Sequence, residues 1–318
     1  MAVWPFSQRE LAPWNDQIGE CGVDVVHAGP LTTVAANLSR SIAAPFAAMS
    51  WGSDVLLQAA DCSTSRARAI AAVSRADVIL GDCTAVIEEI CRWLPELETP
   101  YIEFPWGLEL SRFGTLPFDA SARLRAQLGW QDATVLISTR SWEPHYGIGN
   151  LIAAFAEVAR DEQSLRLILV GDGSLHDQIL ADIARRGLGE RVTCPGRIDE
   201  SELPAWYGAA DIYVSASRCD GSSVSLLEAM ACGLPVIVHE RYGNREWVDE
   251  GSIGWMTDCT DAARLAQALR KSIFARPAWR AMGRLGRQRV FDRADWESNA
   301  KKLGVAYELA VSRYRLRA

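Results

Sequence analysis

Two acidic residues, Asp220 and Glu228, stand eight positions apart around a polar turn and an apolar helical pattern. The turn reads Asp-Gly-Ser-Ser and follows a strand pattern at 212–215. Ser222 is the expected N-cap, because a serine hydroxyl accepts well from an unpaired N–H group of a first helical turn. Free amides and the positive end of the helix dipole favour a phosphate there. The residues predicted to surround it are Gly221, Ser222, Ser223 and Val224.

The two carboxylates would repel a phosphate, so their expected partners are hydroxyl groups, such as those of a ribose or a sugar. A site that holds a diphosphate together with sugar hydroxyls suits a nucleotide-sugar. The alternative for this stretch is a buried helix preceded by a plain loop, as in any α/β protein.

Arg140 follows the strand pattern 134–138 and is a second candidate for phosphate binding. An arginine at the carboxyl end of a strand can hold a diphosphate through two charge-assisted hydrogen bonds. Arg197 is a further candidate, with a plain surface position as its alternative. Gly171 and Gly173 let the backbone approach a ligand. Their G-x-G-x-x-H order also resembles the dinucleotide fingerprint, which keeps an NAD(P) oxidoreductase open as a third interpretation.

Apolar strand patterns alternate with helical patterns twice along the chain, which predicts two α/β units built on parallel sheets. In such sheets ligands bind beyond the carboxyl ends of the strands. The strands expected in the second alternation are 134–138, 165–170, 192–194, 212–215, 236–239 and 254–256. Residues 108–113 between the alternations are expected to be irregular.

The run S-L-L-E-A-M-A-C-G-L-P-V-I, residues 225–237, resembles the family 4 retaining glycosyltransferases of the GT-B fold, also called glycosyl transferases group 1. That family carries two acids separated by seven residues, the first usually Glu where this chain has Asp220. The resemblance implies two doubly wound Rossmann-like domains facing a cleft, without a metal or other cofactor. It implies a nucleotide-sugar donor and a glycan, lipid or small-molecule acceptor. The expected domains are 1–115, 116–295 and a helix 296–318 that crosses back to the first domain.

The resemblance also assigns roles to single residues. It implies that Glu228 holds the ribose, Asp220 the transferred sugar, and Arg140 with the amides of 222–224 the diphosphate. Gly171 and Gly173 would lie near the donor, and Gly196 where the family contacts the base through its backbone. Gly243 follows strand 236–239 and would bring backbone near the sugar, with a plain turn as its alternative.

This chain departs from the family pattern at several positions. The lysine expected about six residues after Arg140 is replaced by Tyr146 or Gly147. The H-G-x-D turn here begins with Trp51 and ends with Asp54, an acceptor contact or, as favoured, a helix cap. His27 would bind sugar or serve a structural role. The N-terminal Gly-rich loop is missing, so the first domain is expected to be shortened. A non-catalytic nucleotide-sugar-binding protein is therefore the main alternative.

The composition limits the partners. The 318 residues are 49% hydrophobic and 23% charged, with a net charge of −7 that argues against nucleic acid. Residues 270–318 nevertheless hold 13 Lys/Arg against 4 Asp/Glu, which leaves open a weak peripheral contact with anionic lipid. The eight cysteines form no C-x-x-C pair, so no metal or redox site is expected. The expected location is the cytoplasm, with the inner membrane face as the peripheral alternative.

Overall fold

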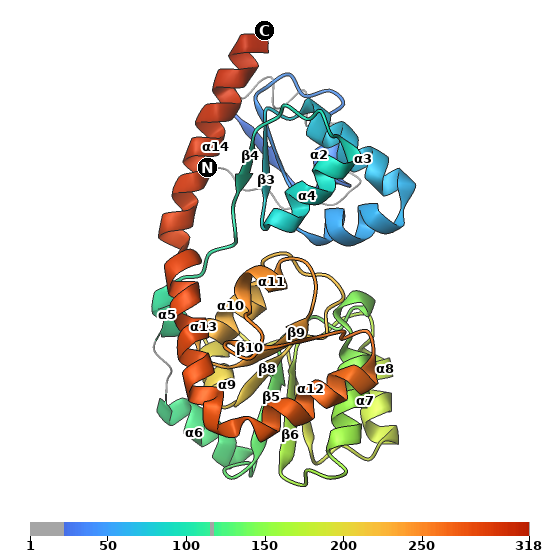
Figure 1. Cartoon of the computed structure of the whole chain (residues 1–318), viewed down its shortest axis with the longest axis vertical. Coiled ribbons are helices and arrows are strands. Elements are labelled where there is room, and N and C mark those ends of the chain that lie inside the picture. The colour runs from blue at the N-terminus through green and yellow to red at the C-terminus, as the bar shows by residue number, and fades with distance from the viewer. Residues whose placement is uncertain (1–21, 115–117, 318) are drawn as a thin grey trace. The chain divides into compact units, whose positions relative to one another are not determined.

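The computed structural model describes residues 22–114 and 118–317. The chain divides into two units (Figure 1). Unit 1 is Met1–Pro105 with Ser298–Ala318, and unit 2 is Trp106–Glu297. The boundary thus falls after Pro105, while the sequence suggested residue 115. The predicted shortening of the N-terminus concerns residues outside the described part of the chain.

Unit 1 contains a four-stranded parallel sheet in the order β1-β2-β3-β4. Its middle strands are fully buried, as their continuous apolar runs predict. The strands are β1 (Val26–Ala28), β2 (Phe46–Met49), β3 (Val78–Gly81) and β4 (Tyr101–Glu103). The connecting helices are α2 (Val34–Leu38), the π-helix η1 (Asp54–Ala59), α3 (Ser63–Arg75) and α4 (Thr84–Trp93).

The last helix, α14 (Trp296–Arg317), joins unit 1 along most of its length. Asn299 donates to the carbonyl of Pro105 at 3.0 Å, and the Tyr314 hydroxyl donates to that of Ala43 at 3.0 Å. Arg317 pairs with the buried carboxylate of Asp77.

Unit 2 contains a six-stranded parallel sheet in the order β10-β9-β8-β5-β6-β7. The chain builds outward from β5 in one direction and then from β8 in the other, so the topological switch point lies between β5 and β8. The strands are β5 (Thr134–Ser138), β6 (Leu165–Val170), β7 (Val192–Gly196), β8 (Ile212–Val214), β9 (Val236–His239) and β10 (Gly254–Thr257). The two parallel sheets confirm the predicted α/β class, and the reversal of strand order makes the unit 2 sheet doubly wound, whereas the four described strands of unit 1 follow chain order.

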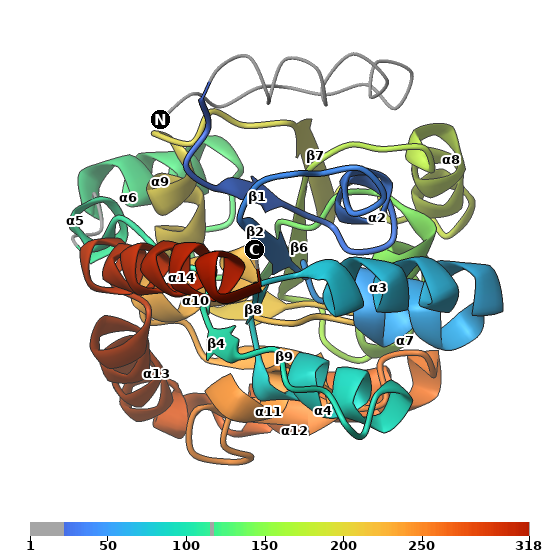
Figure 2. The ribbon, with the colours of Figure 1, turned by 90° about the horizontal axis from the view of Figure 1, so that it is seen from above.

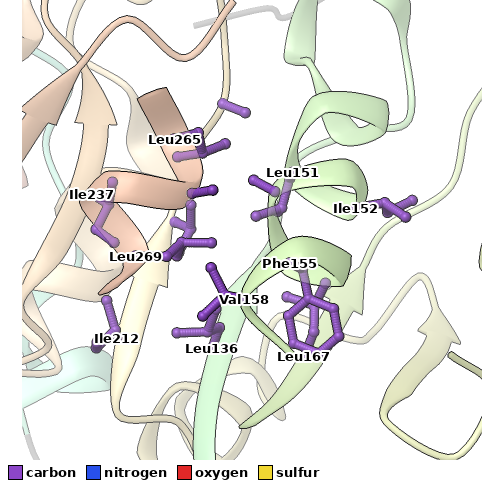
Figure 3. Packing of buried hydrophobic residues seen from close by; sticks show 14 of the residues in the cluster. Leu136, Leu151, Ile152, Phe155, Val158, Leu167, Ile212, Ile237, Leu265 and Leu269 are labelled. Carbon is purple, nitrogen blue, oxygen red and sulfur yellow. The ribbon is translucent and has the colours of Figure 1, made fainter. Parts of the chain in front are cut away.

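Helices cover both faces of this sheet, as alternate residues of β5 show. Leu136 packs with α7 (Ile148–Val158), α8 (His176–Arg185) and α12 (Ala262–Phe274), and Figure 3 shows it near Val158. Val135 and Ile137 face the second cluster. That cluster includes residues of α9 (Leu203–Gly208), α10 (Val224–Ala231), α11 (Asn244–Trp247) and α13 (Trp279–Arg293). Within unit 2, Figure 2 shows α7 and α8 on one side of the strands and α9 and α13 on the other.

The segment between the two alternations is more helical than predicted. α5 (Leu110–Gly114) lies within residues expected to be irregular, and α6 (Phe118–Gln127) follows. Phe113 is buried in the second cluster. This tertiary contact stabilises α5, which the local sequence pattern does not predict.

The end of α10 lies directly against α13. Gly233 follows α10 with a φ of +78°, a left-handed conformation that favours glycine. A Cβ atom on Gly283 of α13 would collide with the carbonyl oxygen of Gly233. The two backbones can approach this closely only because position 283 has no side chain.

Candidate functional site

The switch point of unit 2 brings together residues far apart in sequence. Arg140 follows β5, and Asp220 lies in the loop between β8 and α10. The carboxyl ends of these adjacent strands lie at the same edge of the sheet. This edge is where open parallel sheets bind ligands.

Arg140 is the centre of the contacts at this edge. Its Nη2 atom donates to Oδ1 of Asp220 at 2.5 Å, and its Nη1 atom donates to the Ser225 hydroxyl at 2.9 Å and to that of Ser223. The guanidinium lies 4.2 Å from the ring centroid of Tyr146. The side chain is 10% exposed, so the contacts hold one nearly buried cation at the site.

Asp220 is buried as deeply as Arg140. Burial raises the pKa of its carboxyl group, and the Arg140 charge opposes that rise. Its Oδ2 atom has no hydrogen-bond partner among the described residues, nor do the buried Nε of Arg140, Nε1 of Trp142 and Oδ1 of Asn244. Buried polar atoms are rarely left unpaired, so this region is suited to a polar ligand or ordered water.

Glu228 lies on α10, and its Oε2 atom accepts a hydrogen bond from the Tyr207 hydroxyl at 2.8 Å. The same hydroxyl lies 2.8 Å from the hydroxyl of Thr139, next to Arg140. Burial raises the pKa of Glu228 to about 7, and the Tyr207 hydrogen bond opposes the rise. Glu228 is thus linked to the end of β5 through one tyrosine.

The predicted cap at Ser222 is wrong. The N-cap residue of α10 is Ser223, and its side chain makes no capping hydrogen bond because its hydroxyl accepts from Arg140. The Ser222 hydroxyl instead accepts from Nε1 of Trp247 at 3.0 Å. Val224 is 41% exposed at the start of the helix, so this end of α10 is open to a ligand.

The predicted glycines lie where backbones meet. A Cβ atom on Gly243 would collide with the carbonyl of Gly221, and its N–H donates to the carbonyl of Asp220 at 3.2 Å. A Cβ atom on Gly171 would lie 2.6 Å from the carbonyl oxygen of Arg140. One on Gly173 would lie 2.6 Å from that of Trp142. These glycines hold the loops after β6 and β9 against those of Arg140 and Asp220.

Gly196 and Arg197 lie on the far side of β6. The carbonyl of Gly196 accepts from the N–H of Gly171 at 2.9 Å. Arg197 is exposed. The pKa of Asp172 is lowered mainly by the N–H of Gly173 and by His176, with a smaller contribution from Arg197.

The predicted residues of unit 1 contact other parts of that unit. Asp54 is 1% exposed and accepts three hydrogen bonds, from the Leu31 N–H, the Ser50 hydroxyl and the Trp51 N–H. Its carboxylate thus fixes a turn, but the favoured prediction of a helix cap is wrong, because the N-cap residue of η1 is Ser53 and all three donors lie outside that helix. The His27 ring lies 2.9 Å from the Tyr307 hydroxyl of α14 and 3.2 Å from the Met49 sulfur. Trp51 is 53% exposed and remains open to a partner.

Three site residues escaped the sequence analysis, namely Tyr207, Ser225 and Tyr213. Tyr213 contacts the Ser225 hydroxyl at 2.9 Å. Both tyrosines occupy apolar positions of their elements, so the pattern predicted only burial. The available signal was the residue type itself, because the hydroxyl of a buried tyrosine usually has a hydrogen-bond partner.

Within the described ranges, 22–114 and 118–317, no group of three His, Cys, Asp or Glu residues could hold a metal ion. The helices of those ranges include none long and apolar enough to span a bilayer.

The model of one protein family, described as glycosyl transferases group 1, matches residues 121–289, more than half of the chain. The match spans Arg140, Asp220 and Glu228.

Sequence relatives carry related names. The chain is 30% identical over 206 residues to a GDP-mannose-dependent alpha-(1-6)-phosphatidylinositol monomannoside mannosyltransferase of Mycolicibacterium smegmatis, covering 63% of this chain and 54% of that protein. It is 30% identical over 212 residues to a D-inositol 3-phosphate glycosyltransferase of Segniliparus rotundus, covering 65% and 46%. The chain spans about half the length of these relatives.

Solved structures share the fold over nearly the whole chain. A sucrose-phosphate synthase from Thermosynechococcus elongatus matches with a TM-score of 0.81 and 24% identity, covering 94% of this chain and 76% of that one. The Anabaena protein HepE in complex with UDP and glucose matches with a TM-score of 0.80 and 22% identity, covering 96% and 83%. Together with the two parallel sheets, these matches confirm the GT-B fold.

Proposed function

Because this chain belongs to the glycosyl transferases of group 1, we propose that it transfers a sugar from a nucleoside diphosphate donor to a hydroxyl acceptor. The observation that carries the proposal is the meeting of Arg140, Asp220 and the start of α10 at the switch point of unit 2. The names of its relatives, which include a GDP-mannose-dependent enzyme and a protein bound to UDP, support a donor of this class.

In this proposal, Arg140 and the amides of residues 222–224 hold the diphosphate. Glu228 accepts hydrogen bonds from the ribose hydroxyls, and Asp220 accepts from a hydroxyl of the transferred sugar. Arg140 is paired with Asp220 in the structure. Donor binding therefore exchanges one oxyanion partner of Arg140 for another, and releases Asp220 toward the sugar. The acceptor is a glycan, a lipid or a small molecule.

The proposed transfer retains the configuration of the sugar. The bond between the anomeric carbon and the diphosphate oxygen breaks, and the positive field of Arg140 stabilises the charge that gathers on the diphosphate. The acceptor hydroxyl attacks from the same face and gives its proton to the departing phosphate oxygen. No separate general base is required, which fits a chain with Trp51 where the family has histidine.

Calorimetry with UDP, GDP and ADP tests the donor site. We expect Arg140→Ala to weaken the best of the three by about 100-fold, because charge-assisted hydrogen bonds are lost. We expect Glu228→Ala to weaken it by about tenfold. Arg123→Ala, on an exposed face of α6, is the control and should bind as the parent does.

The Arg140 variant leaves Asp220 buried without its cation, which can destabilise the fold. The double variant Arg140→Ala/Asp220→Asn removes that charge and keeps the binding test valid. The site assignment is wrong if the folded Arg140 and Glu228 variants both bind every diphosphate as tightly as the parent.

A non-catalytic nucleotide-sugar-binding protein is the second candidate. Both ring nitrogens of His27 contact protein atoms, of Tyr307 and Met49, and this observation favours it. Mass spectrometry of donors incubated with the protein and mixed acceptors separates the two. Release of nucleotide with a glycosylated product supports transfer, and binding without release supports the second candidate. The family match gives no support to the oxidoreductase alternative.

A further inference from the structure

The outer face of α13 carries exposed apolar and basic side chains together. α12 leads through a short 3-10 turn, η3 (Arg276–Ala278), into α13 (Figure 1). Phe274, the last residue of α12, is 93% exposed, and Leu285 is 53% exposed. The buried stripe of α13 contains Trp279, Met282, Gly283, Gly286 and Val290. Arg280, Arg284 and Leu285 thus lie on the opposite face at helical spacing.

The arginines of this segment divide into two groups. Residues 276–293 contain six arginines and one aspartate. Arg289 pairs with Asp249, Arg293 donates to the carbonyl of Glu246, and Arg287 stacks on Phe291. By contrast, no ion pair joins Arg280 or Arg284 to an acid of residues 22–114 or 118–317. Their charges are directed to solvent.

The adjacent end of α12 adds no free charge, since Arg270 pairs with Glu157 and Lys271 with Glu250. The Arg276 guanidinium lies 5.5 Å from the ring centroid of Trp279, which holds a third cation at the start of α13, two positions after Phe274 in the sequence. Packing inside unit 2 accounts neither for the outward charges of Arg280 and Arg284 nor for the 93% exposure of Phe274 at the preceding helix end.

We propose that Phe274, Arg276, Arg280, Arg284 and Leu285, here called the α13 surface, dock unit 2 onto an anionic phospholipid bilayer. Arginines attract the headgroup phosphates, while the phenylalanine and leucine side chains enter the boundary with the acyl chains. A protein partner of similar chemistry would need an acidic groove, whereas a bilayer supplies negative charge and apolar depth without one.

The charge of the rest of the chain has the opposite sign. Residues 1–269 hold 20 Lys/Arg and 36 Asp/Glu, after the 13 and 4 of residues 270–318 are subtracted from totals of 33 and 40. An anionic membrane repels the first part and attracts the last. This inference does not depend on the proposed donor site.

Vesicle co-sedimentation of the full chain tests the proposal. We expect binding to vesicles of phosphatidylcholine with about one third phosphatidylglycerol, weak binding to pure phosphatidylcholine, and a loss of binding at high salt. Arg280→Gln/Arg284→Gln should bind the anionic vesicles about 25-fold more weakly, because each basic residue near such a surface contributes roughly fivefold. Phe274→Ser should also weaken binding.

The control Arg68→Gln/Arg123→Gln makes the same change in charge at exposed positions of α3 and α6. It should keep nearly all of the parent's binding. The proposal fails if the parent does not sediment with anionic vesicles, or if the control loses as much binding as the α13 variant. It also fails if Phe274→Ser abolishes self-association in sedimentation velocity without affecting vesicles, since the surface would then join two copies of the chain.

Discussion

Asp54 in unit 1 and Asp220 in unit 2 are both aspartates in polar turns that follow a parallel strand. Both are buried, and burial raises the pKa of both. The Asp54 carboxylate accepts three hydrogen bonds, two from Ser50 and Trp51 of its own turn and one from the N–H of Leu31. Asp220 contacts Arg140 through one oxygen and leaves the other unpaired among the described residues.

This difference shows that position at a strand end does not by itself make a site. The buried Asp54 carboxylate is hydrogen-bonded to protein donors in place of water, and these bonds stabilise a turn. Asp220 and its neighbours retain unmet hydrogen-bonding capacity, which a ligand can use. The four predictions below test this contrast.

The largest expected effect is on the stability of unit 1. Asp54→Ala leaves three donors without their acceptor, which should cost about 4 kcal/mol. Hydrogen exchange read by mass spectrometry should show faster exchange in β1 and β2, with unchanged nucleotide affinity in calorimetry. A stable variant that binds nucleotide poorly would instead make Asp54 a ligand contact.

Glu228→Gln should stabilise the protein at alkaline pH. The pKa of Glu228 rises from 4.5 to about 7 on folding, so the native state binds a proton that the unfolded state has released. The parent therefore loses stability as the pH rises from about 4.5 through 7, and the neutral variant does not. The variant should gain about 3 kcal/mol over the parent at pH 8 and little at pH 4. Urea unfolding at both values measures this, and a constant difference would contradict the assignment.

Gly243→Ala should destabilise unit 2 by about 2 kcal/mol, because the new methyl group meets the Gly221 carbonyl. Nucleotide affinity should fall with it, since Gly221 adjoins Asp220. Gly149→Ala in α7 is the matched control, as nothing lies within 4 Å of its added Cβ atom. That control should be neutral or slightly stabilising. Equal losses in both would show that Gly243 has no special position.

The smallest effect is a gain. Asp220→Asn should tighten nucleoside diphosphate binding by about tenfold, because Arg140 no longer has an anionic partner to leave. Sugar transfer should nevertheless fall, because the neutral amide is a weaker acceptor for the sugar hydroxyl. Calorimetry and product analysis on the same preparation measure both. Weaker diphosphate binding would show that the ion pair positions Arg140 rather than competing for it.

The strands and the position of the main site could be predicted from the sequence. β5, β6 and β9 begin and end at the predicted residues, because a buried parallel strand is written as a continuous apolar run. Arg140 and Asp220 could be assigned to one ligand site in advance, since both follow strands and resemble known motif positions, but their ion pair was not predicted.

The hydrogen bonds of the site could not be predicted from the sequence. The Ser223 hydroxyl accepts a hydrogen bond from Arg140, which lies 83 positions away in the sequence. No local pattern distinguishes Ser223 from the neighbouring Ser222. Tyr207 reaches Glu228 from another helix, so only the packed structure shows the contact. The same holds for α5, whose turn depends on burial of Phe113.

The contact between Gly233 and Gly283 has a consequence for how this protein can change over evolutionary time. A side chain at position 283 must push α13 away from the carboxyl end of α10. The other end of α10, about 12 Å away along the helix axis, begins at the proposed donor loop, so such a shift would reach that loop. Position 283 therefore cannot drift freely, although it lies more than 50 residues beyond Glu228 in the sequence. A substitution on the outer face of α13 leaves this contact intact, whereas one at the inner glycine moves the helix against the donor loop.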